Sequence, residues 1–205
     1  MITYDEGLRA QDEVVNHLRG SSADIELGTI LGLEHQSVIT LGKRGRVEED
    51  LEVGADELKR RGIELHISPR GGQATLHSPG QLVIYPCVSL MKMGLGVRDY
   101  VSLLEKVTQA FLKDLGLEAK PDPEEPGLYT AKGKIAFFGI RVTHAIASHG
   151  IAINAGNDLS LFKLIRSCGK ASEKFDAIKL KKNQTMSQLF ALWVNHFRKE
   201  LEHLS

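Results

Sequence analysis

Cysteine is scarce in this chain, and its scarcity excludes several classes of protein. Only two cysteines, Cys87 and Cys168, occur among 205 residues, so the chain lacks the disulfide framework of small secreted domains. Charge of one sign is not in excess either. Lysine plus arginine and aspartate plus glutamate number 26 each, whereas a general nucleic-acid binder carries a basic surplus. We therefore expect a reduced chain with two free thiols and no nucleic-acid partner.

Long hydrophobic runs are also missing. Residues 1–9 contain no apolar stretch of the kind that secretory signals carry. The best apolar stretch, 82–88, is far shorter than the roughly 20 residues that a membrane-spanning helix needs. The apolar content of 42% and charged content of 25% are typical of globular proteins. We expect a cytoplasmic protein that binds no membrane, and the length fits one domain over 1–205.

Hydrophobic spacing predicts three helices, at 4–18, 97–115 and 186–204, and Thr185 with Gln188 forms a capping box before the last one. Predicted strands cover 25–33, 37–41, 62–68, 81–88, 134–142 and 149–154, with a turn at 34–36 and a polar turn between the last two. Because strands and helices do not alternate strictly, the pattern favours an α+β fold with a mixed or antiparallel sheet. The proline-containing loop at 120–127 would divide a larger lobe from a smaller C-terminal one.

The two cysteines differ in their surroundings. Cys87 lies inside an apolar strand, where a buried and inert thiol is the favoured interpretation. Cys168 lies in the polar segment Arg-Ser-Cys-Gly-Lys at 166–170, where cations stabilise a thiolate and a glycine leaves the sulfur accessible. The spacing alone leaves two readings of Cys168 open, a catalytic nucleophile and a chance surface thiol.

The glycine-rich segment 70–81 has two readings, a plain hairpin turn and a close approach of backbone to a ligand. Its spacing matches neither a Walker phosphate loop nor a dinucleotide fingerprint. The segment 42–46, Gly-Lys-Arg-Gly-Arg, resembles a phosphate cradle superficially and is interpreted as a basic surface turn. His77, His144 and His149 lie in different segments, which argues against a zinc site. No G-x-S-x-G elbow is present, which argues against an α/β-type serine hydrolase.

Four motifs in one order resemble a known family. The segment from Arg70 to Tyr85-Pro86 resembles a signature that begins R-G-G-x-x-T-x-H-G-P-G-Q, and residues 134–141 resemble K-I-A-x-x-G-x-R. Residues 149–154, followed by Asp158-Leu159 and Cys168-Gly169, resemble H-G-x-A-x-N…D-L…C-G, and 34–42 match an earlier E-H…T-L-G segment. These motifs are those of the lipoyl(octanoyl) transferases, relatives of lipoate and biotin protein ligases. Each motif alone is weak, but four in register are specific.

The resemblance implies a fold and a reaction. The fold would be that of the ligase catalytic domain, an α/β sandwich with a mixed, largely antiparallel sheet flanked by helices. The enzyme would take octanoate from octanoyl-acyl carrier protein and form a thioester on Cys168. It would then form an amide on a lysine of a lipoyl-carrier domain, either in a dehydrogenase complex or in the glycine cleavage carrier protein. No cofactor and no metal are implied, and we expect a monomer.

The resemblance also implies roles for residues. Cys168 would be the nucleophile, and Lys134 would favour its thiolate and later take a proton from the attacking amine. Gly169 would help to hold the oxyanion. The acyl pocket would be lined by three segments, with these residues: Arg70, Gly71, Gly72, Gln73, Ala74, Thr75, Leu76 and His77; Phe137, Phe138 and Gly139; and Gly150, Ile151 and Ala152.

The chain departs from the family pattern at Leu76, Ser78, Ile84 and Ser167, which bears on acyl-chain length and on the stiffness of the cysteine loop. Three other functions stay open: an ATP-dependent lipoate- or biotin-type ligase, a non-catalytic paralogue that binds carrier domains, and an amidotransferase that moves octanoate between carrier proteins. The ligase needs a nucleotide site and no cysteine. Acylation of a carrier domain without ATP would separate it from the transferase.

Overall fold

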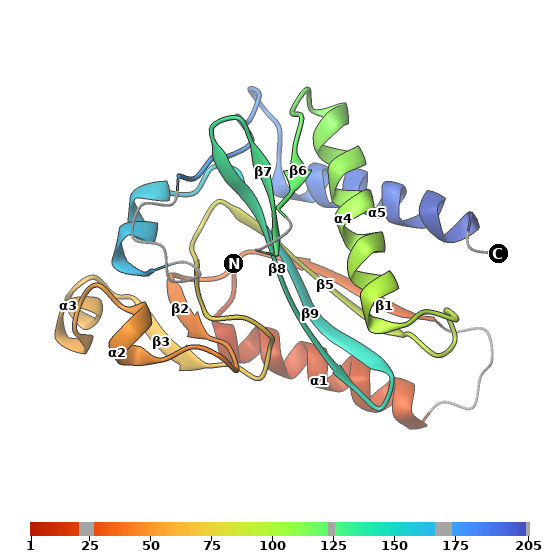
Figure 1. Cartoon of the computed structure of the whole chain (residues 1–205), viewed down its shortest axis with the longest axis horizontal. Helices are drawn as coiled ribbons and strands as arrows, with labels where there is room; N and C mark the ends of the chain where they lie inside the picture. The colour runs from red at the N-terminus through yellow and green to blue at the C-terminus, as the bar shows by residue number, and fades with distance from the viewer. Residues whose placement is uncertain (21–26, 123–125, 167–173, 204–205) are drawn as a thin grey trace.

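A computed structural model describes residues 1–20, 27–122, 126–166 and 174–203, and in these ranges nine strands form two sheets (Figure 1). The larger sheet has six antiparallel strands, in the order β1 (Gly28–Leu33), β5 (Gln81–Ser89), β9 (Ile146–Asn154), β8 (Gly133–Thr143), β7 (Gly127–Thr130) and β6 (Lys120–Pro121). β5 lies inside this sheet and all nine of its residues are buried, which explains why its sequence reads as a continuous apolar run.

The smaller sheet has three strands, in the order β3 (Glu64–Ile67), β2 (Val38–Leu41) and β4 (Ala74–His77). β2 pairs in parallel with β3 and antiparallel with β4. Two short helices, α2 (Val47–Asp50) and α3 (Ala55–Arg60), connect β2 to β3. This sheet and the 3-10 helix η1 (Leu159–Leu164) contribute to a hydrophobic core on one face of the larger sheet.

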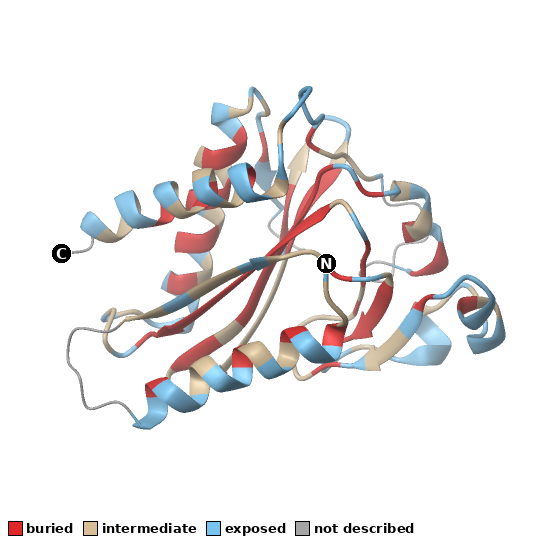
Figure 2. Cartoon of the chain, turned by 180° about the vertical axis from the view of Figure 1, so that it is seen from behind, coloured by how far each residue is buried: buried red, intermediate tan, exposed pale blue. Residues whose placement is uncertain are grey.

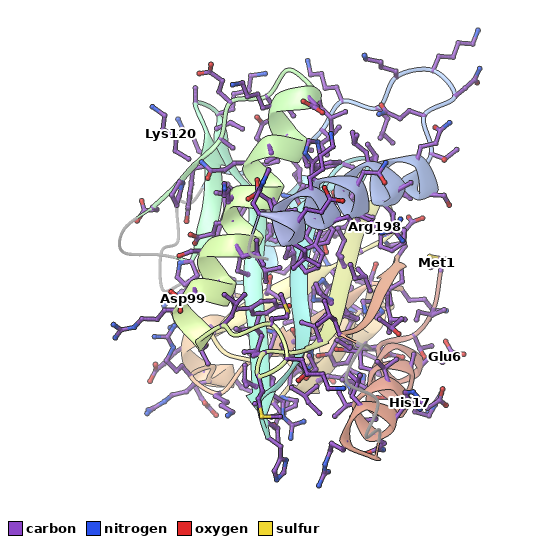
Figure 3. All side chains as sticks on the ribbon, turned by 90° about the vertical axis from the view of Figure 1, so that its right-hand side faces the viewer. Met1, Glu6, His17, Asp99, Lys120 and Arg198 are labelled. Carbon is purple, nitrogen blue, oxygen red and sulfur yellow. The ribbon has the colours of Figure 1, made fainter. Side chains whose placement is uncertain are left out.

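Helices cover both faces of the larger sheet. α4 (Val97–Asp114) and α5 (Met186–Glu202) pack on one face around a core that includes Trp193 and Phe111. α1 (Tyr4–Gly20) crosses the other face, beside the smaller sheet (Figures 1 and 2). Charged side chains lie on the outer surfaces of these elements, as Glu6, Asp99 and Arg198 show (Figure 3). No helix in the described ranges is both long and apolar enough to cross a membrane.

The predicted fold class is confirmed, and so are all three long helices. The capping box is present, since the Thr185 hydroxyl accepts from the backbone N–H of Gln188 at 3.2 Å, while the Gln188 amide oxygen accepts from the N–H of Thr185 at 3.0 Å. Several boundaries differ. β9 begins at Ile146 rather than at residue 149, because His144 and Ala145 both have positive φ and close a two-residue hairpin without the usual glycine.

The structure defines two connections that the sequence left open. The strands on either side of the turn at 34–36, β1 and β2, do not pair, because they belong to different sheets. Of the two readings of the glycine-rich segment, the hairpin turn is wrong, because 70–73 connects β3 to β4, which lie on opposite sides of β2. Sequence patterns also missed α2, α3, β4, β6, β7 and η1, each of six residues or fewer.

Candidate functional site

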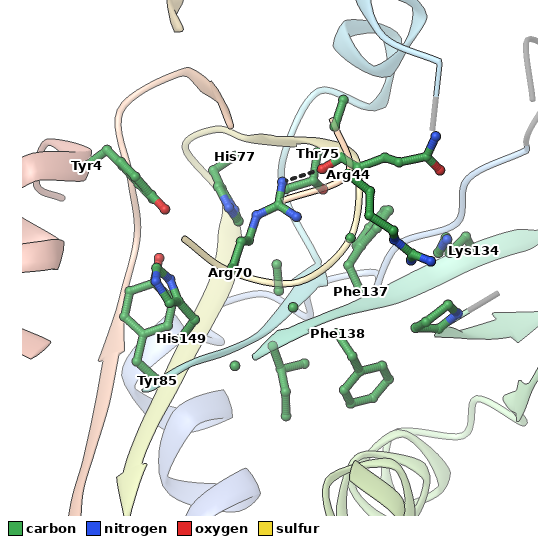
Figure 4. Close-up of a pocket in the computed structure, with 18 residues that line it drawn as sticks. Tyr4, Arg44, Arg70, Thr75, His77, Tyr85, Lys134, Phe137, Phe138 and His149 are labelled. Carbon is green, nitrogen blue, oxygen red and sulfur yellow. Dashed lines mark hydrogen bonds between the residues drawn. The ribbon is translucent and has the colours of Figure 1, made fainter. Parts of the chain in front are cut away.

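A cavity of about 640 Å³, counted to its open mouth, lies between the larger sheet and the loop that crosses β2 (Figure 4). Most of its lining residues come from three parts of the chain that are distant in sequence: segment 70–77, β8 and β9. The residues that line it are Tyr4, Arg44, Arg70, Gly72, Gln73, Ala74, Thr75, His77, Tyr85, Pro126, Lys134, Phe137, Phe138, Gly139, His149, Gly150, Ile151 and Ala152.

The loop 70–73 forms one wall, and Arg70 holds it in place. The guanidinium of Arg70 donates to the hydroxyl and the carbonyl of Thr40, at 2.9 and 2.6 Å, and to the carbonyl of Gln73 at 2.8 Å. Arg70 is itself only 7% exposed. Gly72 has a φ of 88°, which a side chain would strain, so this glycine is required by the path of the loop.

One end of the cavity is formed by neutral histidines and tyrosines. The phenol of Tyr85 and Nε2 of His35 lie 2.8 Å apart, and Nδ1 of His77 lies 2.8 Å from the amide oxygen of Gln81. The Gln81 amide nitrogen already donates to Asn154 Oδ1, so its oxygen accepts and His77 carries its proton on Nδ1. Burial lowers the pKa of His77 to about 3 and that of His35 to about 4, so both rings are neutral at pH 7.

His149 has an unusual backbone at the same end. Its φ is 55°, and the pairing of β5 with β9 stops at Ile84–Ile151 and resumes at Val88–Ala147. The N–H of His149 donates instead to the side-chain oxygen of Gln11 on α1, at 2.6 Å. Burial lowers the pKa of His149 to about 3. Strained backbone at a cavity wall is typical of functional sites, because the surrounding structure must hold it there.

Lys134 also lines the cavity, and it is 1% exposed. Its ammonium lies 5.2 Å from the centre of the Tyr129 ring and 5.3 Å from that of Phe137, a spacing that suits cation–π attraction. The backbone of Lys134 pairs with segment 174–176: its N–H donates to the carbonyl of Lys174 and its carbonyl accepts from the N–H of Asp176. In the view of Figure 4, Lys134 and Arg44 lie toward one side, and Tyr4, Tyr85 and His149 toward the other.

The structure brings together most of the residues named from the sequence. Of the pocket residues expected there, all line the cavity except Gly71 and Leu76. Leu76 is fully buried in the core beneath the smaller sheet. Phe137 stacks on Phe162 with ring centres 5.2 Å apart, whereas Phe138, although it lines the cavity, also packs against the helix-side core.

The two cysteines have different outcomes. Cys87 is buried, as predicted, and burial raises the pKa of its thiol to about 12, which disfavours the reactive thiolate. Cys168, together with Ser167 and Gly169, lies outside the described residues. His77 and His149, although distant in sequence, both line the cavity, whereas His144 is exposed in the turn between β8 and β9. Within the described ranges, however, no three metal-ligating side chains are grouped to hold an ion.

Sequence reasoning missed five lining residues: Tyr4, Arg44, Tyr85, Pro126 and His149. Tyr4 carries no local signal, since it opens an ordinary helix. Arg44 was noticed only as part of a basic turn, and His149 only as part of a motif and as one of three histidines weighed against a zinc site. The signal that could have found Tyr85 and His149 is their place inside the matched segments, where a polar ring within an apolar strand is unusual.

Solved structures with this fold are lipoate protein ligases. A putative lipoate protein ligase from Thermoplasma acidophilum, with bound lipoic acid, superposes with a TM-score of 0.75 at 18% identity, covering 99% of this chain and 83% of that one. Lipoate-protein ligase A bound with ATP gives a TM-score of 0.68 at 17% identity, over 85% of this chain and 72% of its own. At these identities the likeness establishes the fold alone.

The sequence relatives are more similar. The mitochondrial octanoyltransferase LIP2 of Arabidopsis thaliana is 34% identical over 179 residues, which is 87% of this chain and 74% of the relative. An octanoyltransferase of Nitratidesulfovibrio vulgaris is 39% identical over 172 residues, 82% of this chain and 78% of the relative. The model of the lipoyl protein ligase A/B catalytic domain matches residues 3–198. The chain belongs to this family and is an acyltransferase.

Proposed function

We propose that this enzyme transfers an octanoyl group from octanoyl-acyl carrier protein, through a thioester on Cys168, to a lysine of a lipoyl-carrier domain. The observation that carries the proposal is the convergence of the matched motifs on one cavity. Segment 70–77, β8 and β9 wall it together, and Lys134 lines it. The proposed acyl group, octanoyl, and the proposed class of reaction, acyl transfer, are those in the name of the relatives, octanoyltransferase.

The first half of the reaction is a thioester exchange. The Cys168 thiolate attacks the carbonyl carbon of the donor thioester, a bond forms to its sulfur, and the bond to the donor sulfur breaks. The departing thiolate takes a proton from the Lys134 ammonium, which leaves that lysine neutral. An ammonium near the cysteine also favours the thiolate by opposite charge, since a free thiol has a pKa of about 8.5.

The second half is aminolysis of the acyl-enzyme. The amine of the carrier-domain lysine attacks the thioester carbonyl, and neutral Lys134 takes the proton that the amine loses. An amide forms, the bond to the Cys168 sulfur breaks, and both catalytic groups regain their starting charges. Neither half of the reaction requires ATP.

The chain on both sides of Cys168 is anchored close to this chemistry. Two residues before it, the N–H of Arg166 donates to the carbonyl of Asp50 at 2.8 Å. Six residues after it, the carbonyl of Lys174 accepts from the N–H of Lys134 at 2.8 Å. These anchors support a site in which the cysteine works with Lys134.

The test is a transfer assay that also separates this function from an ATP-dependent ligase. Octanoyl-acyl carrier protein, a lipoyl-carrier domain and the enzyme are combined without ATP, and the carrier domain is followed by mass. We expect one octanoyl group to appear on its lysine. A carrier domain that is modified only when free octanoate and ATP are supplied would establish the ligase instead.

A further inference from the structure

We propose that Lys43 and Arg44 bind the phosphate of the donor's phosphopantetheine arm, at the edge of the acyl cavity. This inference rests on the proposed function, because it names the part of the donor that the enzyme recognises. Both residues occupy the centre of a four-residue turn, in which the N–H of Gly45 donates to the carbonyl of Gly42 at 2.8 Å. The central residues of such a turn form its tip, so their side chains project from it.

The turn is attached directly to the wall of the cavity. The N–H groups of Gly42, Lys43 and Arg44 donate to the carbonyls of Gln73, Arg70 and Gly72, at 3.1, 3.0 and 3.1 Å. Arg44 itself lines the cavity that also contains Lys134 (Figure 4). The backbone that carries these two cations is therefore held in a fixed position, beside the opening through which a thioester must enter the cavity.

The same hydrogen bonds determine what kind of phosphate the turn can bind. Phosphate loops for nucleotides cradle several oxygens with unpaired backbone N–H groups. Here the four N–H groups of 42–45 are already committed to carbonyls. Only side-chain cations remain to bind an anion, which suits one exposed phosphodiester better than a triphosphate.

The charges around the turn leave these two cations available. Arg46 pairs with Glu49 at 3.3 Å, and the buried carboxylate of Asp50 accepts from the backbone N–H of Arg46. Among the described residues, no acidic side chain pairs with Lys43 or Arg44, and both are exposed. An arm that carries an acyl thioester at one end and a phosphodiester at the other matches a cavity bordered by such a pair.

The experiment compares octanoyl-pantetheine with octanoyl-4′-phosphopantetheine as donors, and measures kcat/KM for acylation of Cys168. We expect the phosphate to raise kcat/KM in the wild-type enzyme by roughly 5- to 10-fold, the range of a charge-assisted contact at a partly exposed site. In the double variant Lys43→Ala/Arg44→Ala, the ratio of kcat/KM for octanoyl-4′-phosphopantetheine to kcat/KM for octanoyl-pantetheine should fall to about 1, whatever happens to the absolute rates. Arg98→Ala, which removes an exposed arginine from α4, should keep the wild-type ratio.

Either of two results in the donor comparison overturns the inference: the wild-type enzyme does not distinguish the two donors, or the double variant still does. If the double variant keeps its ratio and instead loses acylation by octanoyl adenylate selectively, the turn is assigned to a nucleotide. Failure of the proposed function is distinguishable, because Cys168 would then be acylated by neither thioester.

Discussion

At the residue scale, the position of the Lys134 side chain depends on Gly127, which has no side chain of its own and leaves room for the lysine. Gly127 on β7 lies under the lysine, and a Cβ on this glycine would come within 2.6 Å of Lys134 Cε and 2.9 Å of the carbonyl oxygen of Ala136. The lysine is held between this glycine and the rings of Tyr129 and Phe137. A buried ammonium fixed in this way can act on a neighbouring thiol only if its position is kept.

We predict that Gly127→Ala displaces the Lys134 ammonium and slows acylation of Cys168 by roughly 10- to 100-fold, because a misplacement of about 1 Å at a reacting group is costly. Stopped-flow acylation by octanoyl-acyl carrier protein measures the rate. Gly54→Ala is the matched control, since a Cβ at Gly54 meets nothing within 4 Å. Equal rates for the two variants would show that Gly127 does not position the lysine.

We also predict that Lys134→Ala raises the pKa of the Cys168 thiol and slows acylation by about 100-fold or more, because both the stabilising charge and the proton relay are lost. The pH profile of Cys168 alkylation by iodoacetamide measures the pKa. A Cys87→Ser background removes the other thiol, which is buried. If the profile of Lys134→Ala superposes on that of the parent, the electrostatic role is wrong.

At the scale of elements, a chain of side chains connects the histidine end of the cavity to the segment after Cys168. His77 contacts Gln81, and Gln81 donates to Asn154 Oδ1 at 3.0 Å. Asn154 then donates to the carbonyl of Asp176 at 3.1 Å, and its own carbonyl accepts from the N–H of Ile178 at 2.9 Å. The end of β9 therefore holds 176–178 in place beside β8.

We predict that Asn154→Ala impairs alkylation and acylation of Cys168 beyond what its loss of stability explains. The variant removes the bond to Asp176 and leaves one N–H of the Gln81 amide without its acceptor, which costs about 1–3 kcal/mol. Rates are compared at conditions where both proteins are fully folded. Asn157→Ala removes one bond to Asn154 and spares that to Asp176, so it should lose stability while Cys168 keeps its reactivity. Parallel losses of Cys168 reactivity in both variants would contradict a positioning role.

The sequence predicts those elements whose own residues form a recognisable pattern, and it misses those that depend on pairing with a distant segment. Helices α1, α4 and α5 are 17 or 18 residues long with apolar residues at helical spacing, and β5 is apolar from Leu82 to Val88, so their own patterns define them. β4 is Ala-Thr-Leu-His and pairs with β2 across a distance of more than 30 residues, so no local pattern reveals it. The division into two sheets depends on that pairing, and only the folded chain shows it.

The site divides in the same way. Motif matching named Lys134, Arg70 and most of the wall, because these residues lie within contiguous signatures. It could not place Tyr4 or Arg44, which reach the cavity from the first helix and from a turn. Their contribution is set by how α1 and the smaller sheet pack on the larger one.

At the scale of the whole molecule, three buried neutral histidines make stability depend on pH. The pKa of each is lowered from 6.5, to about 4 for His35 and to about 3 for His77 and His149. As the pH falls below 6.5, these three histidines bind protons in the unfolded chain but stay neutral in the folded chain. The free energy of unfolding therefore falls with pH between 6.5 and the folded pKa values, and is unaffected by these groups above 6.5.

We predict that the urea midpoint of the wild type drops steeply between pH 6.5 and pH 4, with each histidine contributing about 1.4 kcal/mol per pH unit. His149→Asn should remove one such contribution from the slope. His144→Asn is a matched control, because both positions have a positive φ, which asparagine tolerates, and His144 is exposed. A His149→Asn slope equal to that of the wild type would contradict the account.

The central claim is that Cys168 carries the acyl group, and intact mass tests it most directly. After incubation with octanoyl-acyl carrier protein and no acceptor, the wild type and Cys87→Ser should each gain the mass of one octanoyl group, removable by hydroxylamine as a thioester. Cys168→Ser should gain no hydroxylamine-labile octanoyl group. An adduct that persists as a thioester in Cys168→Ser, or that maps to Cys87, would contradict the account.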